Sequence, residues 1–221
     1  IANLRFIEAI RQANPEAKIV YASTRQIYGK PQYLPVDEAH PIVPPDINGI
    51  HKFATENYHL LYARVYGLRA TALRLTNVFG PRMRIRDARQ TFLGIWVRNV
   101  LEGKPIEVWG GEQRRDFTYV DDLVDALLAA AGAKETDGQV FNVCGCPPLT
   151  LLELAQRLLD IAGTGSFERR EFPAERKKID IGDFYGTDTA FRQATGWIPC
   201  FSLESGLTAT LEFYRRHFSE Y

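Results

Sequence analysis

The chain has 221 residues, of which 45% are apolar and 24% are charged, a balance typical of a globular protein with a sizeable core. Its 27 Lys and Arg residues equal its 27 Asp and Glu residues, so the net charge gives no general electrostatic reason to expect nucleic acid or a membrane as a partner. Local clusters must account for any anion binding.

Helices and strands alternate over the first third of the chain. Apolar residues at helical spacing predict the helices, and the second helix has a suitable N-cap in Asp46 after Pro44 and Pro45. Short apolar runs, in part β-branched, predict buried strands. The order strand, helix, strand indicates one right-handed crossover of a parallel sheet. The predicted helices are 1–14 and 46–67, and the predicted strands are 17–22 and 69–75.

Polar residues follow both predicted strands. Ser23 and Thr24 come after the first strand, and Thr76 and Asn77 come after the second. Ligands of open parallel sheets bind beyond the carboxyl ends of the strands, so these side chains are candidates for chemistry. A simple capping turn explains the first pair equally well.

Beyond Pro81 the chain becomes rich in arginine. Arg82, Arg84, Arg86 and Arg89 fall within eight residues. Arginine grips phosphate with paired donors, although a solvated charged loop is the alternative. We predict further helices at about 90–102, 121–131, 150–162 and 203–218, strands at 106–109 and 139–143, and a charged loop at 172–188.

The three cysteines indicate no cross-linked framework. They are odd in number, and Cys144 and Cys146 lack the nearby His or Cys partners of a zinc site. The sequence also has no long apolar run and no leader pattern. We therefore expect no metal site and no membrane span, and reduced thiols in a cytoplasmic protein.

Five motifs in a fixed order carry a resemblance to a known family. The chain is similar to the extended short-chain dehydrogenase/reductases, and more narrowly to their NAD-dependent nucleotide-sugar epimerases, dehydratases and decarboxylases. The match runs in register from Ile1 to the C-terminus. The motifs are Ser23-Thr24-x-x-Ile27-Tyr28-Gly29, Gly49-Ile50-x-Lys52, Leu73-Arg74-Leu75-Thr76-Asn77-Val78-Phe79-Gly80-Pro81-Arg82-Met83, Gln113-x-Arg115-Asp116-Phe117-x-Tyr119-Val120-x-Asp122-Leu123 and Thr195-Gly196-Trp197-x-Pro199.

The resemblance implies an α/β fold. It is a partial Rossmann-like parallel sheet whose N-terminal strands are missing, with a smaller C-terminal α/β substrate domain. Residues 1–81 correspond to the C-terminal part of the NAD-binding domain, and residues 82–221 correspond mainly to the nucleotide-sugar domain, with some segments returning to the sheet. The family's glycine-rich turn, which holds the dinucleotide pyrophosphate, has no counterpart here. We expect NAD in the intact protein and weak or no NAD binding by this chain alone.

The family's catalytic positions are matched in part. Thr24 corresponds to the hydroxyl at the strand end, and Lys52 to the lysine that lowers the pKa of a tyrosine and holds the nicotinamide ribose. The tyrosine position is Asn48, an amide with no proton to exchange near neutral pH. His51 is the first candidate for a substitute acid/base, because imidazole titrates near neutrality. The phenol of Tyr28 is a weaker one.

The type of reaction follows from the same comparison. The 4,6-dehydratases carry an Asp-Glu pair where this chain has Arg25 and Gln26, and the decarboxylases usually keep the Glu. An epimerase needs neither carboxylate, so we predict an NAD-dependent epimerase-like protein acting on a UDP- or dTDP-sugar. A catalytically impaired nucleotide-sugar-binding or assembly protein is the alternative, because the tyrosine is replaced.

The remaining binding residues are also implied by the resemblance. Ser23, Lys52, Leu75 and Asn77 correspond to cofactor contacts. The predicted nucleotide-sugar contacts are Asn77, Arg82, Arg115 and Arg176.

A four-helix bundle joins the two subunits of family members. The corresponding helices, 1–14 and 46–67, keep Phe6, Phe53, Tyr58 and Leu61 on their second faces. A homodimer is therefore expected.

Overall fold

A computed structural model describes residues 1–86, 92–172 and 180–221. The chain divides into two compact units. Unit 1 comprises Ile1–Thr76, Leu123–Cys144 and Tyr185–Ile198, and unit 2 comprises Asn77–Asp122, Gly145–Phe184 and Pro199–Tyr221. The domain prediction placed its boundary after residue 81 and let later segments return to the sheet; its functional labels stay predictions.

Unit 1 is built on a three-stranded parallel sheet with the strand order β1, β2, β7. The register places Ser23 beside Arg74, and Arg74 beside Asn142, so that one polar row crosses all three strands near their carboxyl ends. The strands are β1 (Lys18–Thr24), β2 (Arg69–Leu75) and β7 (Val140–Val143).

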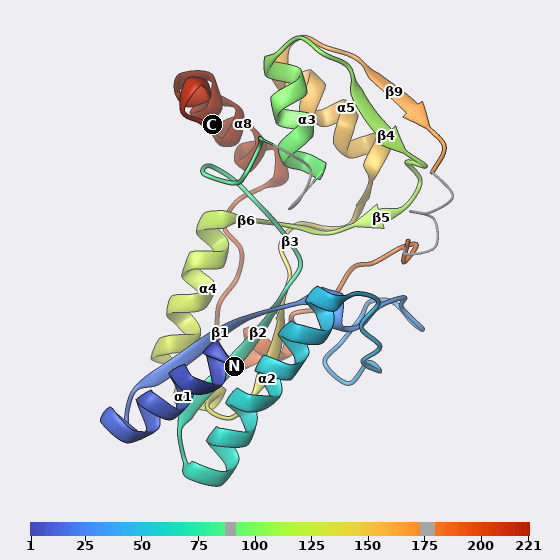
Figure 1. The fold of residues 1–221 in the computed structure, drawn as a ribbon. Coiled ribbons are helices and arrows are strands. Elements are labelled where there is room, and N and C mark those ends of the chain that lie inside the picture. Colours follow the sequence, from blue (N-terminus) through green and yellow to red (C-terminus); the bar gives the residue numbers. More distant parts are fainter. Residues whose placement is uncertain (87–91, 173–179) are drawn as a thin grey trace. The chain divides into compact units, whose positions relative to one another are not determined.

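Helices cover both faces of this sheet. On one face Ile7 of α1 packs with Ile19 and Ala70 of the strands, and Figure 1 shows α1 and α2 along this side. On the other face Ala126 of α4 and Phe191 of α7 pack in a second apolar cluster. Successive strand residues point to opposite faces, which explains the two cores. The helices are α1 (Ala2–Ala13), α2 (Ile47–Tyr66), α4 (Val120–Gly132) and α7 (Thr189–Thr195), with 3₁₀ turns η1 (Arg25–Ile27) and η2 (Lys134–Thr136).

The helix α2 begins and ends where the sequence predicts. The Asp46 side chain accepts a hydrogen bond from Gly49 N, and Gly67 ends the helix in the left-handed conformation. Gly29 lies against the segment that leads into the helix, since a Cβ on Gly29 would come within 2.2 Å of Val43 O. Gly29 also has a φ of +69°, so a larger residue would be strained there.

Unit 2 combines short strand pairs with helices that pack around one apolar core. Figure 1 shows α3 and α5 alongside β4, and residues of both helices and β4 belong to this core. The strand pairs are β3 (Asn77–Phe79) with β6 (Phe117–Tyr119), β4 (Ile106–Trp109) with β9 (Phe167–Arg170), and β5 (Arg114–Arg115) with β8 (Leu149–Thr150). The helices are α3 (Phe92–Leu101), α5 (Leu151–Ala162) and α8 (Leu203–His217), followed by η3 (Phe218–Glu220).

The predicted α/β class with a parallel sheet is confirmed. The sequence did not reveal the strands β3, β5, β6, β8 and β9 or the helix α7. The predicted helix 1–14 is confirmed as α1, in which Ile7 is buried and Leu4 is exposed. None of the helices in the described residues is long and apolar enough to cross a membrane.

Candidate functional site

A buried polar network lies beneath the carboxyl end of the unit 1 sheet. The Glu56 carboxylate, from α2, is fully buried against Arg74, with 2.6 Å between Oε1 and Nη2. Ser23 Oγ donates to the same carboxylate at 2.6 Å. The network ties α2 to β1 and β2, and it commits the Ser23 hydroxyl to Glu56.

The network continues through Tyr28. Arg74 Nη1 donates to Tyr28 Oη at 2.8 Å, and the phenol donates to Asn142 Oδ1 at 2.7 Å. Burial raises the pKa of Tyr28 far above its ordinary value, although the Arg74 cation opposes the shift. A buried phenol that holds its proton so firmly is a structural group, which weakens Tyr28 as a substitute acid/base.

Lys52 lies against the end of β1. Its Nζ donates to Ala22 O at 2.7 Å and lies 5.3 Å from the centre of the Tyr21 ring. Partial burial lowers the pKa of Lys52 below its ordinary value. One of the three N–H donors of the ammonium is thus bonded to the main chain of β1, and this contact fixes the position of the cation.

Thr24 and Asn48 meet different partners. Thr24 Oγ1 caps the η1 turn by accepting from Gln26 N at 3.3 Å. Asn48 is exposed, and its Nδ2 donates to Gln26 Oε1 in a short contact. Gln26 Nε2 in turn faces Asp46 Oδ2 at 3.5 Å. The structure therefore joins Thr24 and Asn48 through the same residue, Gln26.

Two histidines of α2 have different environments. His51 is exposed on the helix surface. His59 is buried, stacks on Tyr21 with ring centres 4.6 Å apart, and has its Nδ1 2.9 Å from Thr55 O. Burial lowers the pKa of His59, although the Thr55 carbonyl opposes the shift. His59 is thus a neutral packing residue, and the role of His51 stays a prediction.

The other predicted site residues fall on both units. Leu75, half-buried, ends β2 in unit 1. In unit 2, Asn77 Nδ2 donates to Asp116 O at 2.8 Å, and Arg82 is exposed with a φ of +66°. Arg176 lies outside the described residues, as does Arg89 of the arginine-rich turn.

Arg115 is a buried cation of unit 2. Its Nη1 donates to Arg114 O at 2.9 Å and to Gly182 O in a short contact, and its ion pair with Asp180 is long, at 3.8 Å. Desolvation lowers the pKa of Arg115, and Asp180 and Asp183 oppose the shift. A guanidinium held in this way is suited to an anion, and its diphosphate contact stays a prediction.

Sequence reasoning missed Glu56 and Asn142 as members of the network. A glutamate four residues after Lys52 lies on the same side of the helix, and an arginine inside an apolar strand needs a partner. Together those two signals could have predicted the ion pair. The polar row of Ser23, Arg74 and Asn142 depends on strand register, which a single sequence does not specify.

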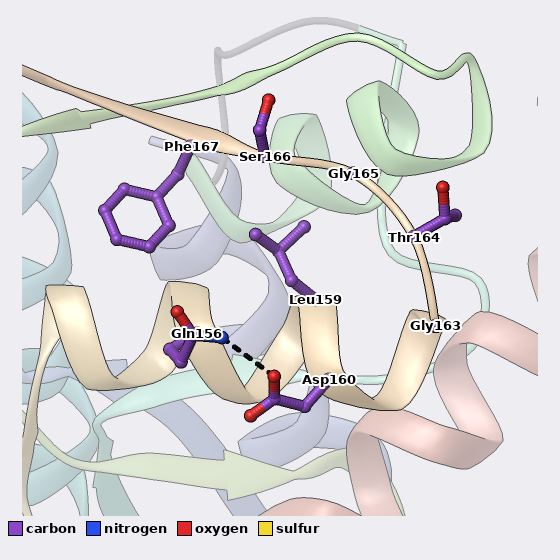
Figure 2. Close-up of a pocket in the computed structure, with 8 residues that line it drawn as sticks. All are labelled: Gln156, Leu159, Asp160, Gly163, Thr164, Gly165, Ser166 and Phe167. Carbon is purple, nitrogen blue, oxygen red and sulfur yellow. Dashed lines mark hydrogen bonds between the residues drawn. The ribbon is translucent and has the colours of Figure 1, made fainter.

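A separate hollow of about 600 Å³ lies where α5 passes into β9 (Figure 2). Gln156 and Asp160 line it and bond to each other at 2.8 Å, next to the turn 163–166. None of the predicted site residues lies there. Within the described ranges, no three His, Cys, Asp or Glu side chains gather closely enough to hold a metal ion.

Comparisons with known proteins agree on one family. The sequence profile of the NAD dependent epimerase/dehydratase family matches residues 1–144. The chain is 28% identical to UDP-glucuronate 4-epimerase 1 of Arabidopsis thaliana over 97% of its own length and 53% of that protein. It is 31% identical to UDP-glucose 4-epimerase of Mycolicibacterium smegmatis, over 97% of its own length and 67% of that protein.

A solved structure gives the same relationship. The crystal structure of UDP-glucose 4-epimerase from Thermotoga maritima, with UDP-glucose, superposes with a TM-score of 0.87 at 30% identity. The match covers 98% of this chain and 69% of that one. The chain thus spans between about half and about two thirds of the length of these relatives.

Proposed function

Because the chain belongs to the NAD dependent epimerase/dehydratase family, we propose that the protein is an epimerase-like enzyme that transiently oxidises and re-reduces a UDP- or dTDP-sugar. The observation that carries the proposal is Lys52, whose ammonium is anchored at Ala22 O beside the carboxyl end of β1. Ligands of parallel sheets bind at that edge. The similarity to UDP-sugar 4-epimerases supports the substrate class.

The residues at this edge fit part of an NAD site. The donors that remain on the Lys52 ammonium and the hydroxyl of Thr24 match the two hydroxyls of a ribose, which both donate and accept. NAD when bound supplies a hydride acceptor. Lys52 would hold and orient the ribose, and the Ser23 hydroxyl, committed to Glu56, would keep the strand end in place.

Asn48 cannot act as the general acid/base at the position where the family has a tyrosine. Its amide can orient a sugar oxygen, but it cannot take up or release a proton near neutral pH. An epimerase of this design therefore needs another acid/base, and His51, three residues further along α2, is the first candidate. The same substitution favours a second function, a nucleotide-sugar-binding or assembly protein without turnover.

Substrate binding is proposed for Asn77, Arg82 and Arg115. An amide donor and arginines suit diphosphate oxygens, and the long Asp180 contact leaves Arg115 electrostatically suited to an anion. Arg176 is a further candidate in the sequence.

The deciding experiment uses the full-length protein. We expect it to contain NAD and to turn over UDP-glucose or another UDP- or dTDP-sugar, with activity lost in Lys52→Ala and kept in Lys104→Ala, which removes an exposed lysine. If the protein binds a nucleotide sugar but neither holds NAD nor converts any sugar, the binding or assembly function replaces the enzymatic one. For the 221-residue chain alone we expect weak or no NAD binding, and a micromolar affinity by calorimetry would contradict this.

We also propose a cytoplasmic homodimer that pairs through α1 and α2. Phe6, Tyr58 and Leu61 are exposed on these helices, and Phe53 is half-buried. Exposed apolar side chains grouped on two helices are typical of an interface. Light scattering across a dilution series should give twice the monomer mass; a monomer at every concentration would refute the pairing.

A further inference from the structure

Three side chains form a chain of polar contacts at the start of α2. Asp46 Oδ1 accepts from Gly49 N at 2.7 Å, and Asp46 Oδ2 faces Gln26 Nε2 at 3.5 Å. Gln26 Oε1 then accepts from Asn48 Nδ2. This series of contacts ends at Asn48, the position where the family places its tyrosine.

The Asp46 carboxylate determines which group donates and which accepts in each of these contacts. An ionised aspartate only accepts hydrogen bonds, so the Gln26 side chain must turn its NH₂ group toward Asp46. The Gln26 carbonyl oxygen then faces Asn48, which must turn its own NH₂ group toward it. The Asp46 side chain is held in this position because it is the N-cap of α2.

The backbone holds Gln26 in place as well. A Cβ added to Gly49 would lie 3.0 Å from Gln26 O, so the η1 turn packs closely on the first turn of α2. Gln26 N is bonded to Thr24 Oγ1. Gln26 is therefore fixed at both its main chain and its side chain, whereas the far side of the exposed Asn48 amide faces solvent.

We propose that Gln26 is a positioning residue that fixes the Asn48 amide in one orientation, and that this amide binds one hydroxyl group of a neutral sugar. In that orientation Oδ1 accepts and the second N–H donates, which matches a hydroxyl that donates and accepts. The sugar half of this inference rests on the proposed function. The site holds the hydroxyl without removing its proton.

The first test reads the amide itself. In full-length protein with ¹⁵N-labelled asparagine side chains, we expect the Asn48 NH₂ group to be ordered and to exchange slowly with solvent. Gln26→Met should raise its exchange rate at least fivefold. Asp46→Asn keeps a good N-cap but can donate as well as accept, so it should have a smaller effect of the same sign.

The matched control is Gln156→Met. Gln156 also donates its side-chain amide to an aspartate on a helix surface, Asp160, and it lies in unit 2 (Figure 2). The Gln156→Met variant should leave the exchange rate of the Asn48 NH₂ group unchanged. An Asn48 amide that behaves identically in Gln26→Met and in the wild type would overturn the positioning role.

The second test is a double-mutant cycle on UDP-glucose affinity, measured by calorimetry. Asn48→Ala should weaken binding about five- to tenfold, the range expected for lost hydrogen bonds to a neutral group. Gln26→Met should weaken it about threefold in the wild type and leave it unchanged in Asn48→Ala, because Gln26 acts through Asn48.

The outcomes separate the two proposals. If UDP-glucose binds but neither substitution changes its affinity, the hydroxyl site is wrong while the proposed function stands. If the wild type does not bind UDP-glucose, the cycle uses the UDP- or dTDP-sugar that the protein does bind; if it binds none, the sugar half fails together with the proposed function, and the exchange data alone decide the role of Gln26.

Discussion

Neutralising the buried Glu56 should cost more stability than removing any surface charge of the chain. The carboxylate is fully buried, Arg74 is 4% exposed, and their charged atoms are 2.6 Å apart. Removing one partner of such a pair leaves a buried charge uncompensated, which costs about 3–5 kcal/mol. Glu56→Gln keeps the volume and an acceptor for Ser23 Oγ, so we expect about 3 kcal/mol. This is a large part of the roughly 5–15 kcal/mol that stabilises an ordinary domain.

Urea denaturation followed by circular dichroism measures the loss, and hydrogen exchange of the β1 and β2 amides assigns it to unit 1. Glu212→Gln is the matched control. Its partner Arg216 is 3.9 Å away, and both side chains are more than half exposed, so the pair should contribute less than about 0.5 kcal/mol. Equal, small losses in the two variants would show that the buried pair does not hold α2 on the sheet.

Three further predictions follow from single groups. Because burial lowers the pKa of His59, the unfolded chain binds more protons than the folded one below about pH 6.5, so stability should fall as the pH drops through that value. The pH slope measured by thermal unfolding should be shallower in His59→Phe, and an unchanged slope would contradict the assignment. Lys52 should lose its proton below the ordinary lysine value of 10.5, measured by ¹⁵Nζ resonance, and a midpoint at or above that value would contradict its burial. Thr150→Ala removes the Thr150 Oγ1 that accepts from Glu153 N, while Thr150 N can still donate to the Glu153 carboxylate; the variant should destabilise unit 2 by about 1 kcal/mol in urea, and no change would show that α5 needs no side-chain cap at residue 150.

The fold could be predicted where local signals agree. Asp46 and Gly67 bound α2, and Thr150 and Gly163 bound α5, as their chemistry requires. The strands β5 and β8 have only two residues each, so their pairing depends on partners remote in sequence and leaves no periodic pattern.

The candidate site could be predicted only in part. Resemblance located Lys52 and Asn48 on one helix, and the structure adds their partners, Ala22 O and Gln26. The residue pattern alone did not distinguish Ser23 from Thr24. Alternation along β1 separates them, because Ser23 bonds to Glu56 of α2 while Thr24 caps the next turn.

The central claim is that residue 48 occupies the acid/base position of a nucleotide-sugar enzyme, one helical turn before an anchored lysine. Turnover of UDP-glucose by full-length Asn48→Tyr, with NAD present, tests it most directly. A phenol at this position should supply the proton transfer that the Asn48 amide cannot, and a positioned acid/base contributes about 10²–10⁴ in rate, so we expect turnover at least tenfold above the wild type. A variant that binds UDP-glucose as the wild type does and yet shows no gain in turnover would contradict the claim.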